Sequence, residues 1–229
     1  MPSKKQTTIL SLGGSLIVPD QLDTVFLAKF KHLIEKQVKS GKQFVIVCGG
    51  GKTNSRYLTA LQEISTVSHA NGDWLGIMAT RLNAEFVRIF FGPLAYEKVL
   101  IDPTKKIKTK QPIIIAAGWK PGHSTDFDAV LWAKQFGAHE VINLSNIDYV
   151  YDKDPREHKD AKPIPAFTWK EFLSKFGGAW SPRMHKPFDP IASKEAAKLK
   201  LKVIIANGAD LGNVEKILNN EKFIGTVIR

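Results

Sequence analysis

The sequence predicts an α/β fold in which a mainly parallel central sheet carries helices on both faces. Two observations predict it. Short apolar runs alternate along the chain with longer segments whose apolar residues recur at helical spacing. Several of the apolar runs also end directly in glycine-containing turns. Repeated strand–helix units of this kind form parallel sheets that are covered by helices on both sides.

The elements follow from these two patterns. Strands are expected at 7–12, 44–48, 112–117, 140–144, 203–205 and 226–228, with a short strand at 99–101. Helices are expected at 22–38 (ended by Gly41), 56–68, 73–91, 127–136, 169–176 and 190–199. The segment 148–165 is dense in Asp, Lys and Pro and reads as a linker or a ligand loop, and 177–188 as a loop. No obvious linker divides the chain, so one domain spanning 1–229 is expected.

The composition narrows the class of protein. Its 229 residues fit one large α/β domain or two small ones, and its net charge of +11 suits nucleic acid, an anionic surface or small anionic substrates. The lysines are dispersed, and the densest run, at 105–110, favours a solvated loop over a nucleic-acid patch. The single cysteine, Cys48, excludes an intrachain disulfide. No apolar run approaches the roughly 18 residues that span a bilayer. A cytoplasmic protein without nucleic-acid or membrane partners is expected.

The most informative segment runs from Gly118 to Asp126, between an expected strand and an expected helix. Ser124 and Thr125 place hydroxyls and free backbone N–H groups where that helix begins. A helix N-terminus carries partial positive charge and unpaired donors, which suits phosphate. Asp126 follows as a fixed carboxylate on the first turn. The segment therefore predicts a phosphate site with a carboxylate that arranges charge around it.

Two similar turns follow other apolar runs. Gly49-Gly50-Gly51-Lys52 follows 44–48, and Gly13-Gly14-Ser15 follows 7–12. Glycines let backbone approach a ligand closely, and the carboxyl edge of a parallel sheet is where such ligands bind. The glycine triplet is not a P-loop, because Ile46 stands where that motif requires its first glycine. Phosphate or nucleoside contact is favoured over a plain tight turn.

These turns belong to an ordered series of motifs that spans nearly the whole chain. After the first two turns come Asp73, Gly76-Ile77, Thr80-Arg81-Leu82-Asn83-Ala84, Pro121-Gly122-His123-Ser124-Thr125-Asp126, Asn146-Ile147-Asp148, Val150-Tyr151, Asp154-Pro155-Arg156 and Asp189-Pro190. In this order they resemble the amino acid kinase superfamily and, within it, the archaeal-type branch of the uridylate kinases. The resemblance implies an αβα sandwich that transfers the γ-phosphoryl group of ATP to UMP. It also implies Mg²⁺ held mainly through nucleotide phosphates, and a homo-oligomer, usually a hexamer.

The resemblance divides the site between an acceptor lobe, roughly 1–140, and a donor lobe, roughly 141–229. Asp73 would accept hydrogen bonds from the UMP ribose, although on the residues alone it could equally cap a helix. Trp119 could stack on uracil or pack the turn. The implied UMP-binding residues are Gly50, Gly51, Arg56, Asp73, Trp119, Gly122, His123, Ser124 and Thr125.

The donor side is implied in the same way. Glycines of the first turn would lie against the ATP phosphates, Tyr151 would stack on the base, and Asp154 would receive ribose hydroxyls. Without the resemblance, the segment around Asp154 is an Asx-rich loop. The implied ATP-binding residues are Gly13, Gly14, Ser15, Lys52, Ser145, Asn146, Tyr151 and Asp154.

Two positions depart from the family pattern. Ser55 stands where the family carries an arginine for the UMP phosphate, and Arg56, one residue later, would point about 100° away on a helix. Arg81 is the substitute candidate. Ser11 replaces a lysine of bacterial members, as in the archaeal-type branch. Asp126 and Lys120 are the expected catalytic residues, and Lys52, Lys186 and Arg183 stay open as supporting cations.

Other functions remain open on the sequence. No histidine pairs with another at metal-ligand spacing, so no protein-held metal site is expected. A kinase acting on another small phosphate, like isopentenyl phosphate kinase, would place a histidine near the glycine triplet, where none stands. A nucleotide-binding or metal-oxoanion storage protein could share the fold. Aromatic residues of the helix expected at 73–91 (Trp74, Phe86, Phe90 and Phe91) suit either an interface or the core.

Overall fold

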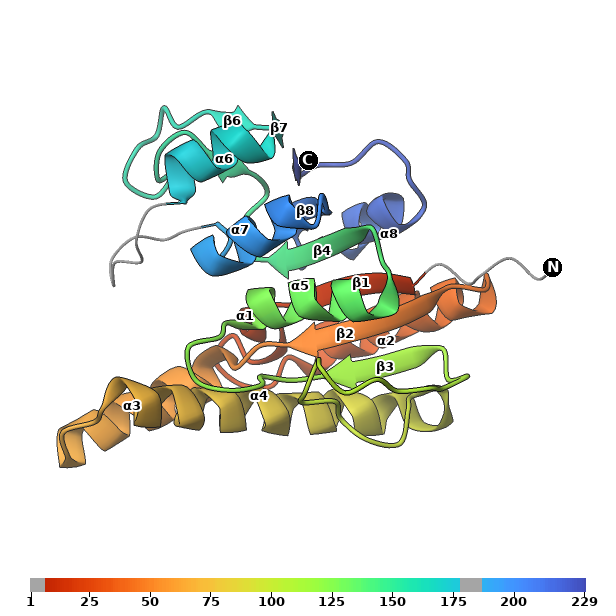
Figure 1. The fold of residues 1–229 in the computed structure, drawn as a ribbon, viewed down its shortest axis with the longest axis vertical. Coiled ribbons are helices and arrows are strands. Elements are labelled where there is room, and N and C mark those ends of the chain that lie inside the picture. Colours follow the sequence, from red (N-terminus) through yellow and green to blue (C-terminus); the bar gives the residue numbers. More distant parts are fainter. Residues whose placement is uncertain (1–6, 178–186) are drawn as a thin grey trace.

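A computed structural model describes residues 7–177 and 187–229 and confirms the mainly parallel sheet (Figure 1). Seven strands lie in the order β3-β2-β1-β4-β8-β9-β7. Their bounds are β1 (Thr7–Leu12), β2 (Gln43–Cys48), β3 (Ile113–Ala116), β4 (Glu140–Ser145), β7 (Ala166–Phe167), β8 (Lys202–Asn207) and β9 (Thr226–Ile228). Strands β1, β2, β3, β4 and β8 pair in parallel, whereas β9 runs antiparallel to β8.

Helices cover both faces of this sheet. They are α1 (Gly14–Ile17), α2 (Thr24–Lys39), α3 (Gly51–Ile64), α4 (His69–Phe91), α5 (Thr125–Phe136), α6 (Trp169–Phe176), α7 (Pro190–Lys198) and α8 (Leu211–Leu218), with a 3₁₀ turn, η1, at Gly92–Leu94. Helix α3 buries none of its residues, and in Figure 1 it lies beside α4 at the edge of the molecule.

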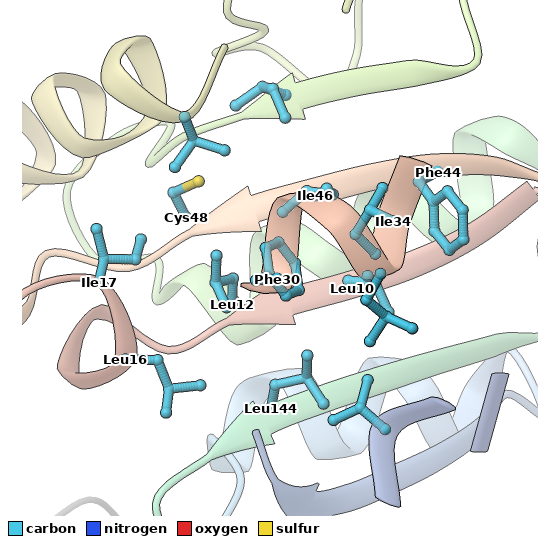
Figure 2. Close-up of a cluster of buried hydrophobic side chains, with 14 of the residues drawn as sticks. Leu10, Leu12, Leu16, Ile17, Phe30, Ile34, Phe44, Ile46, Cys48 and Leu144 are labelled. Atoms are coloured by element: carbon cyan, nitrogen blue, oxygen red, sulfur yellow. The ribbon is translucent and has the colours of Figure 1, made fainter. Parts of the chain in front are cut away.

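Successive side chains of a strand point to opposite faces of the sheet, so the core forms two clusters, one on each face. Leu10 and Ile46 face the cluster that α1, α2, α4 and α8 complete, as Figure 2 shows for Phe30 and Ile34 of α2. Ile9 faces the opposite cluster, which α5, α6 and α7 complete. Because both faces are buried, the strands read as continuous apolar runs rather than as alternating ones. This is why the sequence reveals them.

The strand order creates a reversal point between β1 and β4. The chain moves from β1 outward to β2 and β3, then crosses back through α5 to β4 on the other side of β1. Ile9 therefore pairs with Val45 on one side and with Val141 on the other. Open α/β sheets bind ligands outside the carboxyl ends of the strands at such a reversal.

The structure corrects several predicted boundaries. Helix α3 begins at Gly51 rather than at 56, and α4 begins at His69, where the Ser68 side chain accepts from the Asn71 N–H. Asp73 consequently lies inside α4 and is not its N-cap. The strand expected at 99–101 is only an isolated bridge between Leu100 and Ala116. The segment expected to be irregular at 148–165 contains the short antiparallel pair β5 (Val150–Tyr151) and β6 (Pro163–Ile164).

Most of the loop expected at 177–188 lies outside the described residues, including the candidate cations Arg183 and Lys186. Among the residues that the structure describes, no helix is long and apolar enough to cross a membrane.

Candidate active site

The first two glycine turns pack directly against each other at the carboxyl edge of the sheet. A Cβ added to Gly14 would lie 1.9 Å from the Gly51 backbone nitrogen, and one added to Gly51 would lie 2.3 Å from the Gly14 carbonyl oxygen. Gly51 also has a φ of +59°, which side-chain-bearing residues rarely adopt. Glycine is therefore required here for the close approach of the two turns, whatever ligand lies beyond them.

Helix α4 holds in place the second turn, 49–52, and the segment 118–126, here called the third turn. The Asn83 side-chain amide donates to the carbonyl oxygens of Gly49 and Gly50, at 2.8 and 3.0 Å. The Thr80 hydroxyl accepts from the Gly118 N–H at 2.8 Å, and the Arg81 guanidinium donates to the Trp119 carbonyl at 3.1 Å. The motif 80–84 thus serves to position two ligand loops, a role that its sequence did not reveal.

A cavity of about 500 Å³ opens between α3, α4 and the segment that leads into α5. It brings together predicted acceptor residues from three separate parts of the chain. Those lining it are Gly50, Asp73, His123, Ser124 and Thr125, together with Asn54, Leu58, Gln62, Val67, Ser68, His69, Gly72, Gly76, Ile77, Thr80 and Gly118. The buried Oδ1 atom of Asn54 has no hydrogen-bond partner among the described residues.

Asp73 lines this cavity and contacts the third turn directly. Its Oδ2 accepts from the Gly122 N–H at 2.8 Å, and the residue is otherwise exposed. Ser124 caps α5, since its hydroxyl accepts from the Phe127 N–H. Ser124 and Thr125, at the N-terminus of α5, also line the cavity, so the dipole and free N–H groups of α5 lie beside it. A sugar hydroxyl near Asp73 and a phosphate near the start of α5 would match these two chemistries.

Asp126 occupies the reversal point of the sheet. Its Oδ1 accepts from the Ser11 hydroxyl of β1 at 3.3 Å and from the Asn143 amide of β4 at 2.8 Å. Its Oδ2 accepts from the Asp189 N–H, at the start of α7, at 3.3 Å. Burial, with the Asp189 charge adding to it, raises the pKa of Asp126 to about 6, against the opposing effect of these three donors. A carboxylate so held is fixed in space rather than mobile.

Other predicted cations and aromatics lie differently from the expectation. The Lys120 ammonium is exposed and lies over the Trp119 ring, 4.0 Å from its centroid, rather than beside Asp126. Arg56 pairs with Asp20 at 2.5 Å and is not among the residues that line the cavity. Arg81 also does not line it, because its guanidinium holds the third turn instead. Within the described part of the chain, the cavity lining therefore includes neither a lysine nor an arginine.

Asp128 is a site residue that the sequence did not indicate. Its side chain is fully buried beneath the third turn, where Oδ2 accepts from the Trp119 N–H at 3.1 Å. Burial, reinforced by the Asp126 charge, raises the pKa of Asp128 to about 7. The residue is found on the buried face of α5, where a charged side chain is rare unless it is paired.

The predicted donor residues fall into two groups. Gly13 donates its N–H to the Leu144 carbonyl at 2.9 Å, so the first turn lies beside the end of β4, where Ser145 and Asn146 follow. Ser15 and Lys52 are exposed near this edge. Tyr151 and Asp154 belong instead to the segment of β5 and β6, where Asp154 accepts from Arg156 through both carboxylate oxygens. Burial, with Asp148 adding to it, raises the pKa of Tyr151.

Comparison with known proteins agrees with this architecture. The model of the amino acid kinase family matches residues 6–207. A uridylate kinase of Methanococcus aeolicus is 34% identical over 96% of this chain and 98% of its own length. One of Methanobrevibacter smithii is 30% identical over 96% and 97%. The crystal structure of uridylate kinase from Archaeoglobus fulgidus has a TM-score of 0.82 at 29% identity and covers 98% of this chain and 100% of that one. The chain belongs to the amino acid kinase family.

Proposed function

We propose that this chain is an ATP-dependent uridylate kinase that transfers the γ-phosphoryl group of ATP to UMP, giving UDP and ADP. The observation that carries the proposal is the acceptor cavity, whose lining combines the Asp73 carboxylate with the hydroxyl-bearing N-terminus of α5. The full-length uridylate kinase relatives support it.

The geometry supports a division of labour in this reaction. The glycine turns and the N-termini of α3 and α5 would hold phosphates through backbone N–H groups. The first turn, with Ser15 and Lys52, would lie against ATP, and Mg²⁺ would enter with the ATP phosphates. Phosphoryl transfer depends mainly on positioning and electrostatic stabilisation, so a fixed carboxylate such as Asp126 acts by arranging cations around the transferred group.

A panel of acceptors tests the proposal. UMP, CMP, AMP and GMP are each supplied with ATP and Mg²⁺, and ADP release is measured. We expect UMP to be used in strong preference to the other three. Equal use of all four would contradict the assignment of UMP as the acceptor.

A second candidate is a kinase for another small phosphate, similar to isopentenyl phosphate kinase. His69 and His123 both line the acceptor cavity, so histidines are available there although none follows the glycine triplet. Isopentenyl phosphate is therefore added to the panel, and its use in place of UMP would favour this candidate. Titration with molybdate or tungstate addresses the storage-protein alternative in the same way.

A homo-oligomer is part of the proposal. Trp74, Met78, Leu82 and Ile89 recur at helical spacing along one exposed face of α4, whereas Phe91 belongs to the core. An apolar stripe of this kind suits a self-complementary contact between two copies of the chain. The hexamer implied by the resemblance and the cytoplasmic location both stay predictions, which light scattering and cell fractionation can check.

A further inference from the structure

Two buried polar atoms face each other beneath the acceptor cavity without a hydrogen bond between them. Oδ1 of Asp128 and Nδ1 of His123 lie 3.8 Å apart, and neither has another partner among the described residues. Leaving buried polar atoms unpaired costs free energy. Because 3.8 Å is only slightly longer than a hydrogen bond, a small side-chain movement would pair the two atoms. The Oδ2 atom of Asp128 is already occupied by the Trp119 N–H.

The imidazole ring is held between two aromatic side chains. The ring of His123 meets that of Trp119 edge-on at 5.0 Å between centroids and that of Phe127 at 4.7 Å. His123 also lines the acceptor cavity, with 19% of its side chain exposed. Because the buried nitrogen is Nδ1, the other nitrogen, Nε2, is the one available to a ligand.

We propose that Asp128 and His123 share a proton as one unit that keeps an Nε2–H donor of His123 available to an oxygen atom of the acceptor nucleotide. The inference rests on the proposed function, which assigns the cavity to that acceptor. In this arrangement His123 touches the acceptor, and Asp128 is a positioning residue that acts through His123.

The proton count explains why two groups are needed. When the pair holds two protons, one lies between Oδ1 and Nδ1 and the other lies on Nε2. This holds whether the first proton is bonded to Asp128 or to His123. Nε2–H then donates to a ligand oxygen. When the pair loses one proton, the remaining proton lies on Nδ1 and faces the carboxylate. Nε2 then presents a lone pair, which repels the oxygen atoms of a phosphate or a ribose.

The surroundings favour the form with both groups neutral. Burial raises the pKa of the Asp128 carboxyl, with Asp126 adding to it, and burial lowers the pKa of His123, with Lys120 adding to it. Asp189 opposes the change at His123. With Asp128 protonated, its O–H donates to Nδ1 and the Nε2–H tautomer of the imidazole follows. Acceptor binding should therefore weaken as the pair loses its proton above neutral pH.

The substitution Asp128→Asn separates this pair from a merely structural carboxyl. The Trp119 N–H needs an acceptor, so the amide oxygen takes the place of Oδ2, and the NH₂ group takes the place of Oδ1 and donates to Nδ1. The Nε2–H tautomer is then kept at every pH.

We expect kcat/KM for UMP to fall about two- to tenfold from about pH 6.5 to about pH 9 in the unaltered protein, the size of one hydrogen bond. This alkaline fall should be absent in Asp128→Asn. The phosphate of UMP ionises near pH 6 for both proteins, so it cancels in the comparison. The KM for ATP serves as the control and should be the same in both proteins. An alkaline fall of equal size in the variant would overturn the proposal.

Nitrogen-15 NMR of the imidazole provides a readout that needs no substrate, with His123→Ala used to assign the signal. The unaltered protein should change from the Nε2–H to the Nδ1–H tautomer as pH rises, and Asp128→Asn should stay Nε2–H. A ring that is Nδ1–H throughout would overturn the pair even if UMP is phosphorylated. Conversely, a tautomer change without UMP turnover would leave the pair standing and contradict the proposed function. If Asp128→Asn does not fold, His123→Ala replaces it in the kinetic test. The alkaline fall in kcat/KM for UMP should then be absent in His123→Ala, and an alkaline fall that persists in this variant would overturn the proposal.

Discussion

Asp126 gathers donors from three elements that are far apart in the sequence. Its contact with Ser11 joins residues 115 positions apart, and its contacts with Asn143 and Asp189 reach β4 and the start of α7. Both oxygen atoms are used, so the carboxylate has one orientation. This fixed orientation matters more for the transition state than for binding, because the charge of the transferred group is redistributed there.

Asp126→Ala should therefore lower kcat by about a hundredfold or more while the dissociation constants for UMP and ATP change little. Steady-state kinetics and calorimetric titration of the same variant measure the two quantities. Thr168→Ala, which removes the side-chain cap of α6 and does not line the cavity, is the control for a loss of helix stability alone, at about 1 kcal/mol. A near-normal kcat with a lowered melting temperature would show that Asp126 only supports the fold.

Asp73→Asn should raise the KM for UMP by about tenfold or more, because a charge-assisted hydrogen bond to the ribose is replaced by a weaker one. The KM for ATP should not change. Asp73 is exposed, and asparagine can still accept from the Gly122 N–H. The melting temperature should consequently stay the same. A matching rise in the KM for ATP would contradict an acceptor role.

The two carboxyls on α5 make stability depend on pH in an uncommon direction. In the folded state the pKa of Asp126 is about 6 and that of Asp128 about 7, against 3.8 ordinarily. Between the ordinary pKa and these raised values, the folded state therefore binds more protons than the unfolded state. The contribution of the two carboxyls to the free energy of unfolding consequently falls as pH rises from about 4 to about 7.

Asp128→Asn should accordingly stabilise the protein by about 1 to 3 kcal/mol at about pH 8 and much less at about pH 5. Urea unfolding at the two pH values measures this. Asp160→Asn, at an exposed residue, is the control and should show no such pH dependence. A variant that is less stable than the unaltered protein at pH 8 would contradict the raised pKa of Asp128.

At the scale of elements, α4 connects the core to the ligand loops. Its buried side bears Ala84 and Val87, and the neighbouring Asn83 reaches out to the glycine triplet. Because α4 is packed on the core, it holds the glycine triplet at the acceptor cavity in a fixed position. Packed elements position functional groups more accurately than free loops do.

Asn83→Ala should raise the KM for UMP and also lower the stability by about 1 to 3 kcal/mol, because two glycine carbonyls lose their donor. Asn213→Ala is a matched control, since Asn213 is also a buried asparagine whose amide bridges helix and loop backbone, at Ile224. It should lose comparable stability with no change in KM. An unchanged KM in Asn83→Ala would show that the triplet needs no support from α4.

The sequence predicted the elements whose signals are local. Strands buried on both faces read as apolar runs, and the helix expected at 127–136 is α5, which Gly137 ends in a left-handed conformation. The start of α3 was predicted too late because its N-cap, Gly50, has no side chain to signal it. The start of α4 was predicted too late because Asp73 is itself a typical N-cap residue, whereas the actual N-cap is Ser68. Of the residues that the motif order suggested, Asp73 and Ser124 line the cavity, whereas Asp126 lies at the reversal point of the sheet. The contacts of Asp128 and Asn83 were not foreseen, since their partners lie on other elements and leave no spacing to read.

At the scale of the whole molecule, the proposed contact between two copies uses the exposed stripe of α4. Leu82→Glu or Ile89→Glu should therefore reduce the assembled mass, because a charge would be buried in an apolar contact. Multi-angle light scattering measures the mass. Val25→Glu, at an exposed apolar residue of α2, is the control and should leave it unchanged. A mass unaffected by either α4 substitution would place the contact elsewhere.

Helix α3 forms one wall of the acceptor cavity without burying any residue of its own. Leu58 and Gln62 on this wall can therefore be replaced without opening a hole in the core, whereas the opposite wall is tied to the sheet through α4. Substitutions that cost little folding energy are the ones most readily sampled during evolution and in directed libraries. A library confined to Leu58 and Gln62 is therefore an economical way to vary the lining of the cavity while the fold is kept.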